Sequence, residues 1–137
     1  MSEPEDRRRK NLDVVERGFA ALGAGDMERL VDAFTDDAVL ELPYADPPVR
    51  LEGKDAIRAH VGPALDIFKF HLHITAVYDC DDPDTLVLEY TSEGHVTTTG
   101  KPYRNSYVGI VRFRDGAICF QREYYNPLAA RQALTPE

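Results

Sequence analysis

The spacing of the apolar residues changes once along this chain, and that change constrains the fold more than any other feature. Up to about residue 68 apolar side chains recur at intervals of three and four, the period of an amphipathic helix. From Phe70 onward they recur at every second position, the period of a β-strand. Helices first and long strands second predict an α+β fold, with three N-terminal helices packed on one face of a curved, mainly antiparallel sheet.

The helical half divides into three segments. The first two helices meet at Asp26, an N-capping residue, and the second extends its buried face to Phe34. The third starts near Lys54 and carries His60 on its apolar face. Because Pro63 lies inside this third segment and lacks a backbone donor, we expect a kink or a break just after His60.

Turn signals separate the expected strands. Asp115-Gly116 is a strong two-residue hairpin signal, and Pro47-Pro48 predicts that residues 44–52 form a loop. A length of 137 residues fits one domain over residues 1–137. One short strand and four long ones are expected, at 38–42, 69–78, 85–96, 102–114 and 117–126.

The charge balance narrows the classes of partner. The chain has 24 acidic and 16 basic residues, a net charge of −8, whereas binding to nucleic acid or anionic membranes needs clustered positive charge. We therefore expect no nucleic-acid and no membrane partner. The basic run at residues 7–10 indicates a solvated helix face. Cys80 and Cys119 lack disulfide-framework or zinc spacing, and no apolar leader follows Met1, so a reduced, cytoplasmic setting is expected.

No sequence pattern points to a cofactor. Nucleotide-binding loops, nucleophile elbows and CxxC pairs are missing from the sequence. His71 and His73 form an HxH pair, but a metal site needs a third ligand, and a half-exposed strand explains the pair equally well. The acidic residues 79–84 lack the glycine and distal glutamate of a calcium loop and are interpreted as a hairpin turn. We expect neither a metal nor another cofactor.

Glu123 is the strongest catalytic candidate. A curved sheet covered by helices encloses an apolar pocket, and strand alternation places Glu123 on one face with Gln121 and Tyr125. A carboxyl group in a dry pocket has a raised pKa and can take and return a proton near neutral pH. The alternative for this glutamate is an ion pair with Arg122 or Arg104 at a strand end.

His60 is the second catalytic candidate, because a break after it would turn its ring toward the cavity. A packed histidine with one satisfied nitrogen is the alternative. Tyr44, Asn105 and Tyr107 are expected to hold a substrate oxygen, together with Gln121 and Tyr125 as substrate-binding residues.

Both faces of the expected sheet carry apolar side chains. On the last strand, alternation places Ile118, Phe120 and Tyr124 on the face opposite Glu123. Because the helices can cover only one face, we expect the outer face to contact a second copy of the chain in a homodimer. Coverage by the chain termini is the alternative.

Several stretches resemble a known family. The stretches "FAALGAGDMERLVDAFTDDAVLELP" and "LEGKDAIRAHV" resemble the opening of SnoaL-like proteins in the NTF2-like superfamily, and "QREYYNPLAARQAL" is similar to the phenazine-biosynthesis A/B proteins. The resemblance implies a cone-shaped α+β fold, a homodimer and cofactor-free condensation by a glutamate on the last strand and a histidine on the third helix. Those positions correspond to Glu123 and His60. The tyrosine and two aspartates of ketosteroid isomerases fall on Gly18, Leu42 and Gly109, so steroid isomerisation is not expected.

Two classes of function remain after this comparison. The first is a cofactor-free acid/base enzyme for a small hydrophobic or aromatic carbonyl-type metabolite, acting by cyclisation, condensation, dehydration or isomerisation. The second is a non-catalytic module that binds a small molecule, since a fold does not determine a function. An epoxide hydrolase is a weaker third class, because it needs more paired carboxylates than the pocket is expected to hold.

Overall fold

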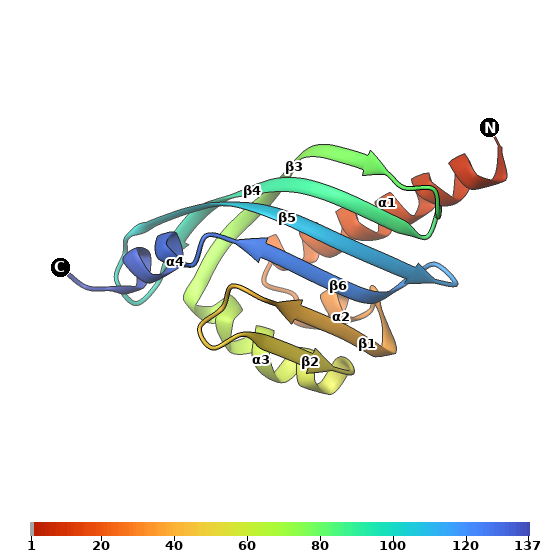
Figure 1. The fold of residues 1–137 in the computed structure, drawn as a ribbon. Helices are drawn as coiled ribbons and strands as arrows, with labels where there is room; N and C mark the ends of the chain where they lie inside the picture. The colour runs from red at the N-terminus through yellow and green to blue at the C-terminus, as the bar shows by residue number, and fades with distance from the viewer. Residues whose placement is uncertain (1) are drawn as a thin grey trace.

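The computed structural model describes residues 2–137. Within this part of the chain, six strands form one curved sheet in the order β2-β1-β6-β5-β4-β3 (Figure 1). Neighbouring strands are antiparallel except β1 and β6, which are parallel. The strands are β1 (Phe34–Leu42), β2 (Val49–Glu52), β3 (Phe68–Asp79), β4 (Thr85–Val96), β5 (Pro102–Arg114) and β6 (Ala117–Tyr125).

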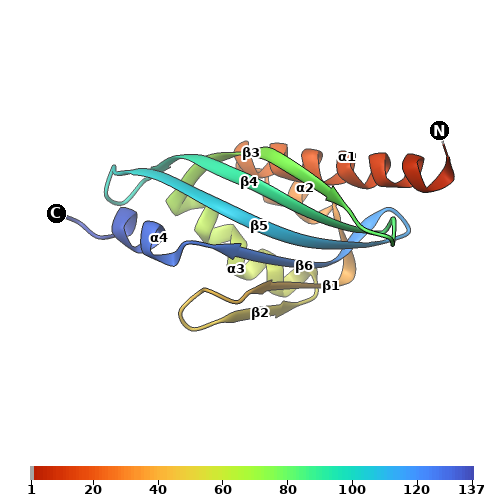
Figure 2. The same cartoon turned by 45° about the horizontal axis from the view of Figure 1, so that its top comes forward.

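The helices lie mainly on one side of this sheet. Figure 2 shows α1, α2 and α3 behind the strands and α4 at the end of the sheet near the C-terminus. α1 packs against β3, and α3 packs against β1. The α+β class with helices packed on a curved sheet is therefore confirmed. The helices are α1 (Glu3–Gly23), α2 (Met27–Val31), α3 (Lys54–Ile67) and α4 (Pro127–Leu134).

The core lies between the helices and the inner sheet face. Along β4 the inward side chains of Leu86, Leu88 and Tyr90 are completely buried, whereas Glu89 and Glu93 alternate with them toward the outer face. Ile57 of α3 packs into the same core cluster. The period-two pattern of the sequence therefore separates a buried face from a polar one on this strand.

The helix count and one helix end were predicted wrongly. α4 was missed, although Asn126 caps it by accepting a hydrogen bond from the backbone amide of Leu128, and Pro127 occupies its first turn. α2 ends at Val31, so Phe34 belongs to β1 and not to a helix face. β1 also starts four residues earlier than expected.

The structure contradicts two expectations based on proline: the loop at residues 49–52 and a break in the third helix. Val49–Glu52 forms β2 instead of a loop, because β2 is an edge strand that pairs only with β1 and begins after Pro48. α3 runs without a break from Lys54 to Ile67 with Pro63 inside it. The remaining backbone hydrogen bonds and the buried side chains Ile57 and Leu65 hold this helix together around the missing donor.

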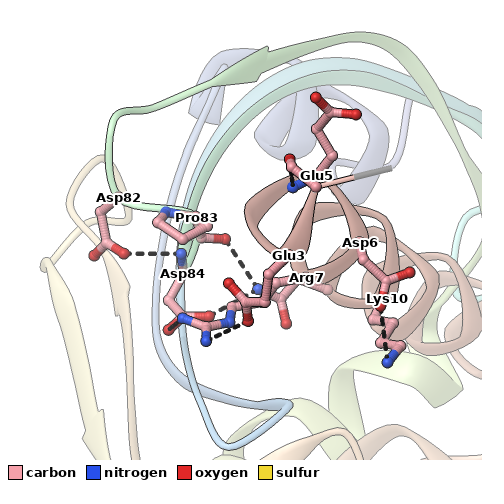
Figure 3. Close-up of polar contacts among 10 residues, drawn as sticks. Glu3, Glu5, Asp6, Arg7, Lys10, Asp82, Pro83 and Asp84 are labelled. Carbon is pink, nitrogen blue, oxygen red and sulfur yellow. Dashed lines mark hydrogen bonds and ion pairs between the residues drawn. The ribbon is translucent and has the colours of Figure 1, made fainter.

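The acidic hairpin between β3 and β4 anchors the start of α1 (Figure 3). The buried side chain of Asn11 donates hydrogen bonds to the Pro83 carbonyl and to Asp84, both at 3.1 Å. Arg7 contacts Asp84 at 3.4 Å, and Arg8 donates to the Cys80 carbonyl at 2.8 Å. The basic run is thus partly docked on the hairpin and is not wholly a solvated helix face. No described helix is long and apolar enough to cross a membrane.

Candidate active site

A cavity of about 300 Å³ lies between the helices and the inner face of the sheet. Most of the side chains that line it are aliphatic or aromatic, which is the usual form of a small-molecule site. Within the described part of the chain, its polar lining side chains are His60, Tyr90, Tyr103, Tyr107, Gln121, Glu123 and Tyr125.

A β-bulge on β6 determines which side chains face this cavity. Phe113 of β5 pairs with Ile118 and Arg112 pairs with Phe120, so Cys119 is the extra residue. The bulge reverses the alternation, and Ile118 is buried on the cavity side instead of facing outward with Phe120 as predicted. Beyond the bulge, Gln121, Glu123 and Tyr125 all line the cavity.

The outward arginines of β5 and β6 do not pair with Glu123. Arg122 donates a hydrogen bond to Glu41 of β1 at 2.7 Å, and Arg104 pairs with Glu93 at 3.3 Å. The alternative in which Glu123 forms an ion pair with one of these arginines is therefore wrong.

Tyr90 holds the carboxyl group of Glu123. The Tyr90 hydroxyl donates to Oε1 of Glu123 at 2.5 Å, and Oε2 of Glu123 accepts no hydrogen bond from a described residue. Tyr90 comes from β4, and it reaches β6 across Gly109 of β5, which pairs directly with Glu123. A Cβ atom at Gly109 would lie 3.0 Å from both Cε1 and the hydroxyl oxygen of Tyr90. The missing side chain at Gly109 therefore makes room for this contact.

The environment of Glu123 changes its acidity. Burial raises the pKa of Glu123 from its ordinary value of 4.5, and the hydrogen bond from Tyr90 opposes part of that change. Burial and the nearby negative charge of Glu123 raise the pKa of Tyr90 well above its ordinary value. The proton between the two groups therefore stays on Tyr90, and Glu123 is the member of the pair that can exchange a proton with a ligand.

A chain of buried hydrogen bonds runs beside this pair. Asn105 donates to the Tyr103 hydroxyl at 2.8 Å, and the Tyr107 hydroxyl donates to Ser92 at 2.8 Å. The two tyrosine hydroxyls are 3.0 Å apart, and since Tyr107 uses its hydrogen for Ser92, Tyr103 is the donor between them. The Tyr107 ring stacks on the Tyr90 ring with centroids 5.0 Å apart. This chain thus fixes the ring against which Tyr90 rests.

Three cavity side chains have no hydrogen-bond partner among the described residues: His60, Gln121 and Tyr125. Buried or enclosed polar groups are normally paired, so free groups in an apolar cavity indicate places for a ligand's polar atoms. His60 lies on α3 and is exposed, at the edge of the cavity. The alternative of a packed histidine with a satisfied nitrogen is therefore not what the structure shows.

The structure places two predicted binding residues outside the cavity lining. Tyr44 is 57% exposed and packs edge-on against Tyr124, which faces away from the cavity. Asn105 is buried, but its amide is used by Tyr103 and by the backbone of Asn126. Neither residue therefore lines the cavity, and the Asn105 amide instead holds Tyr103 and the end of β6 in place.

Two residues of the site, Tyr90 and Gly109, were not predicted from the sequence. Tyr90 lies on the inward side of β4 with Leu86 and Leu88. Its hydroxyl within an otherwise aliphatic inward series was the signal that could have identified it. For Gly109 the signal was a glycine inside a strand, which often marks the close approach of another group.

The outer sheet face holds the histidine pair. His71 and His73 are exposed there, in a shallow groove with Glu93 and Arg104. The described residues contain no group of three or more histidine, cysteine or acidic side chains arranged to hold a metal ion.

Comparison with known proteins gives the family of this chain. The family model of the SnoaL-like domain matches residues 15–121, which is most of the chain. This chain belongs to the SnoaL-like family. The predicted resemblance is thereby confirmed.

Individual relatives match this SnoaL-like protein over nearly its whole length. The uncharacterized protein YesE of Bacillus subtilis is 33% identical over 132 residues, which cover 91% of this chain and 87% of YesE. An uncharacterized PhzA/B-like protein of Pseudomonas aeruginosa is 32% identical over 128 residues and covers 89% of this chain and 88% of its own.

A crystal structure confirms the fold. A protein of Bacillus subtilis superposes with a TM-score of 0.88 at 32% identity, covering 93% of this chain and 94% of its own. The α+β arrangement described above is thus shared with this solved structure.

Proposed function

We propose that this SnoaL-like protein is a cofactor-free acid/base enzyme acting on a small hydrophobic or aromatic carbonyl-type metabolite. Glu123 is the group that takes and returns the proton, and His60 is its partner at the edge of the cavity. The observation that carries this proposal is the hydrogen bonding of Glu123: one carboxyl oxygen accepts from Tyr90, and the other has no partner among the described residues inside an apolar cavity.

The arrangement supports proton transfer next to a carbonyl group. Oε2 of Glu123 takes a proton from the carbon beside the carbonyl, and the electron pair of that C–H bond moves onto the carbonyl oxygen. Gln121 and Tyr125 have free donors on the same strand to stabilise this oxygen. Glu123 then returns the proton to carbon or to a leaving oxygen, which completes an isomerisation or a dehydration. If the enolate carbon instead attacks a second carbonyl, the same step begins a cyclisation or a condensation.

The raised pKa of Glu123 suits this role. A group whose pKa lies closer to neutral pH than that of an ordinary carboxyl can act as base and then as acid in one cycle. The family resemblance supports the same two residues, since its glutamate and histidine positions correspond to Glu123 and His60.

The proposal is tested by hydrogen exchange on carbon, which needs no knowledge of the natural product. 2-Tetralone, an aromatic ketone with acidic α-hydrogens, is incubated with the protein in D₂O, and deuterium uptake is followed by NMR. We expect uptake with the wild type and a loss of about 10²-fold or more in Glu123→Gln, the usual effect of removing a general base. Glu93→Gln on the outer face removes the same charge and should leave uptake unchanged.

The contradicting result is equal uptake in wild type and Glu123→Gln. If 2-tetralone binds in the cavity and neither protein exchanges its hydrogens, the non-catalytic binding module replaces the enzyme as the better interpretation.

We further propose that the outer sheet face forms a homodimer. Val108 is 38% exposed on this face and pairs with Tyr124 of β6; Ile110 follows it on β5, and Phe120 pairs with Arg112 further along the same face. Val108→Asp should convert a dimer to a monomer in size-exclusion chromatography with light scattering. A wild-type protein that elutes as a monomer would contradict this assembly.

A further inference from the structure

The carboxyl group in the cavity has no permanently charged cation beside it among the described residues. Within the described chain, no lysine or arginine lines the cavity, and His60 at its edge is the one lining side chain that can become a cation. Glu123 is faced by Tyr90 from β4, by Tyr103 and Tyr107 from β5, and by Tyr125 of its own strand. None of these tyrosines supplies positive charge.

The arginines of the neighbouring strands all point away. Arg122 pairs with Glu41, Arg114 pairs with Asp37 and Arg104 pairs with Glu93 on the outer side of the sheet. Arg112 lies over the ring of Phe120, which is also on that side. The alternation of β5 and β6 therefore keeps every one of their cations out of the cavity.

The hydroxyl groups of the cavity are also unsuited to an anion. Tyr90 donates its hydrogen to Glu123, and Tyr103 and Tyr107 use theirs within the buried chain that ends at Ser92. Among the described residues, the free donors inside the cavity are Gln121 and Tyr125, which are neutral, and the third free side chain, His60, lies exposed at the edge. Moving a carboxylate or phosphate from water into such a site requires a compensating charge that the site does not offer.

We propose that Glu123 and the exclusion of arginine make this cavity selective against anions, so that its substrate is an uncharged molecule, mainly apolar, with one oxygen for Gln121 and Tyr125. This inference rests on the proposed function for the identity of the site. It adds the charge class of the substrate and excludes metabolites that carry a carboxylate or phosphate within the cavity.

The test compares two ligands with the same skeleton. 2-Naphthylmethanol is uncharged and 2-naphthoate is anionic, and the affinity of each for the intact protein is measured by calorimetry at pH 8.5, where an ordinary histidine is neutral. We expect the alcohol to bind at least about tenfold more tightly than the carboxylate. In Glu123→Gln this ratio should shrink, because the amide carries no charge and can donate a hydrogen bond.

Glu93→Gln is the matched control for net charge. The whole chain carries −8, and a distant repulsion of anions would respond to either substitution. The ratio should therefore be unchanged in Glu93→Gln. Equal affinities in the wild type, an equal response of both variants, or binding of neither ligand would overturn the inference.

The two proposals fail separately. A cavity that binds naphthoate as tightly as the alcohol contradicts charge selection, but it leaves deuterium uptake by Glu123 intact. Uptake that persists in Glu123→Gln contradicts the acid/base role, but it leaves the preference between the two ligands unaffected.

Discussion

The hydrogen bond between Tyr90 and Glu123 should contribute to stability in a way that depends on pH. The perturbation is a double-mutant cycle of Tyr90→Phe, Glu123→Leu and the two changes combined, because leucine removes the acceptor and the cycle then isolates the coupling between the side chains. Tyr90 is 1% exposed and donates at 2.5 Å, so water cannot replace the lost partner. A hydrogen bond to a charged group contributes about 1.5–3 kcal/mol, and one between neutral groups about 0.5–1.5 kcal/mol.

The coupling free energy between Tyr90 and Glu123 should therefore be about 1.5–3 kcal/mol at alkaline pH, where Glu123 is ionised, and about 0.5–1.5 kcal/mol in acid. The assay is urea unfolding followed by circular dichroism, with linear extrapolation to water. A change of 1 kcal/mol in a chain of this length moves Tm by about 3 °C, which thermal unfolding resolves independently.

A second tyrosine–glutamate pair provides the control. The Tyr78 hydroxyl donates to Glu89 at the same 2.5 Å, but on the surface, where Tyr78 is 51% exposed. Its cycle, Tyr78→Phe with Glu89→Leu, should show no measurable coupling, since water competes for both groups. Equal coupling in the two pairs, or a Tyr90–Glu123 coupling that does not change with pH, would refute the reasoning.

Three further perturbations follow from the structure. Gly94→Ala should destabilise the fold by about 1–3 kcal/mol or more, because a Cβ atom there would lie 1.9 Å from the Lys69 carbonyl oxygen. In the same unfolding assay, Gly18→Ala should be neutral or stabilising by about 0.5–1 kcal/mol, because its Cβ atom would make only ordinary contacts. Asn11→Ala should cost about 1–3 kcal/mol by breaking the anchor of α1 on the β3–β4 hairpin, and equal unfolding midpoints for variant and wild type would contradict that anchor. The pKa of Glu123 is raised in the folded state, so its contribution to stability is present below the unfolded pKa and is lost as pH rises through the folded pKa. The free energy of unfolding of Glu123→Gln relative to wild type should therefore increase across that pH interval. A difference that stays constant with pH would contradict the raised pKa.

The sequence predicted the parts of the fold that depend on local period. The last four strands were placed to within one residue at each end, because long alternating runs between turn residues leave little freedom. The hairpin at Asp115-Gly116 followed for the same reason, and both residues have the positive φ that such a turn needs.

The site required pairings that no local pattern encodes. A two-residue turn after Arg114 pairs it with Ala117, and an unbroken ladder from that pair would place Gly109 opposite Arg122. The bulge at Cys119 shifts the ladder by one residue and brings Glu123 opposite Gly109 instead. The contact between Tyr90 and Glu123 depends on this shift.

The predictions for single side chains were likewise correct where strand period decides the position and failed where a loop or a distant contact decides it. Gln121 and Tyr125 were placed correctly beside Glu123, because they lie on one strand beyond the bulge. Tyr44 was misplaced, since loop residues carry no periodicity. Asn105 faces the expected side of β5, but whether its amide is free or used depends on Tyr103 and on the end of β6.

A titration of the Glu123 carboxyl group by ¹³C NMR tests the acid/base role most directly. The signal is assigned by its loss in Glu123→Gln, and its midpoint is compared with the ordinary glutamate value of 4.5. Burial in the cavity predicts a midpoint above that value, so that the group holds a proton at a pH where surface carboxyls have lost theirs. A midpoint at or below 4.5 would show that Glu123 is an ordinary ionised carboxylate and would remove the basis for its role as both base and acid.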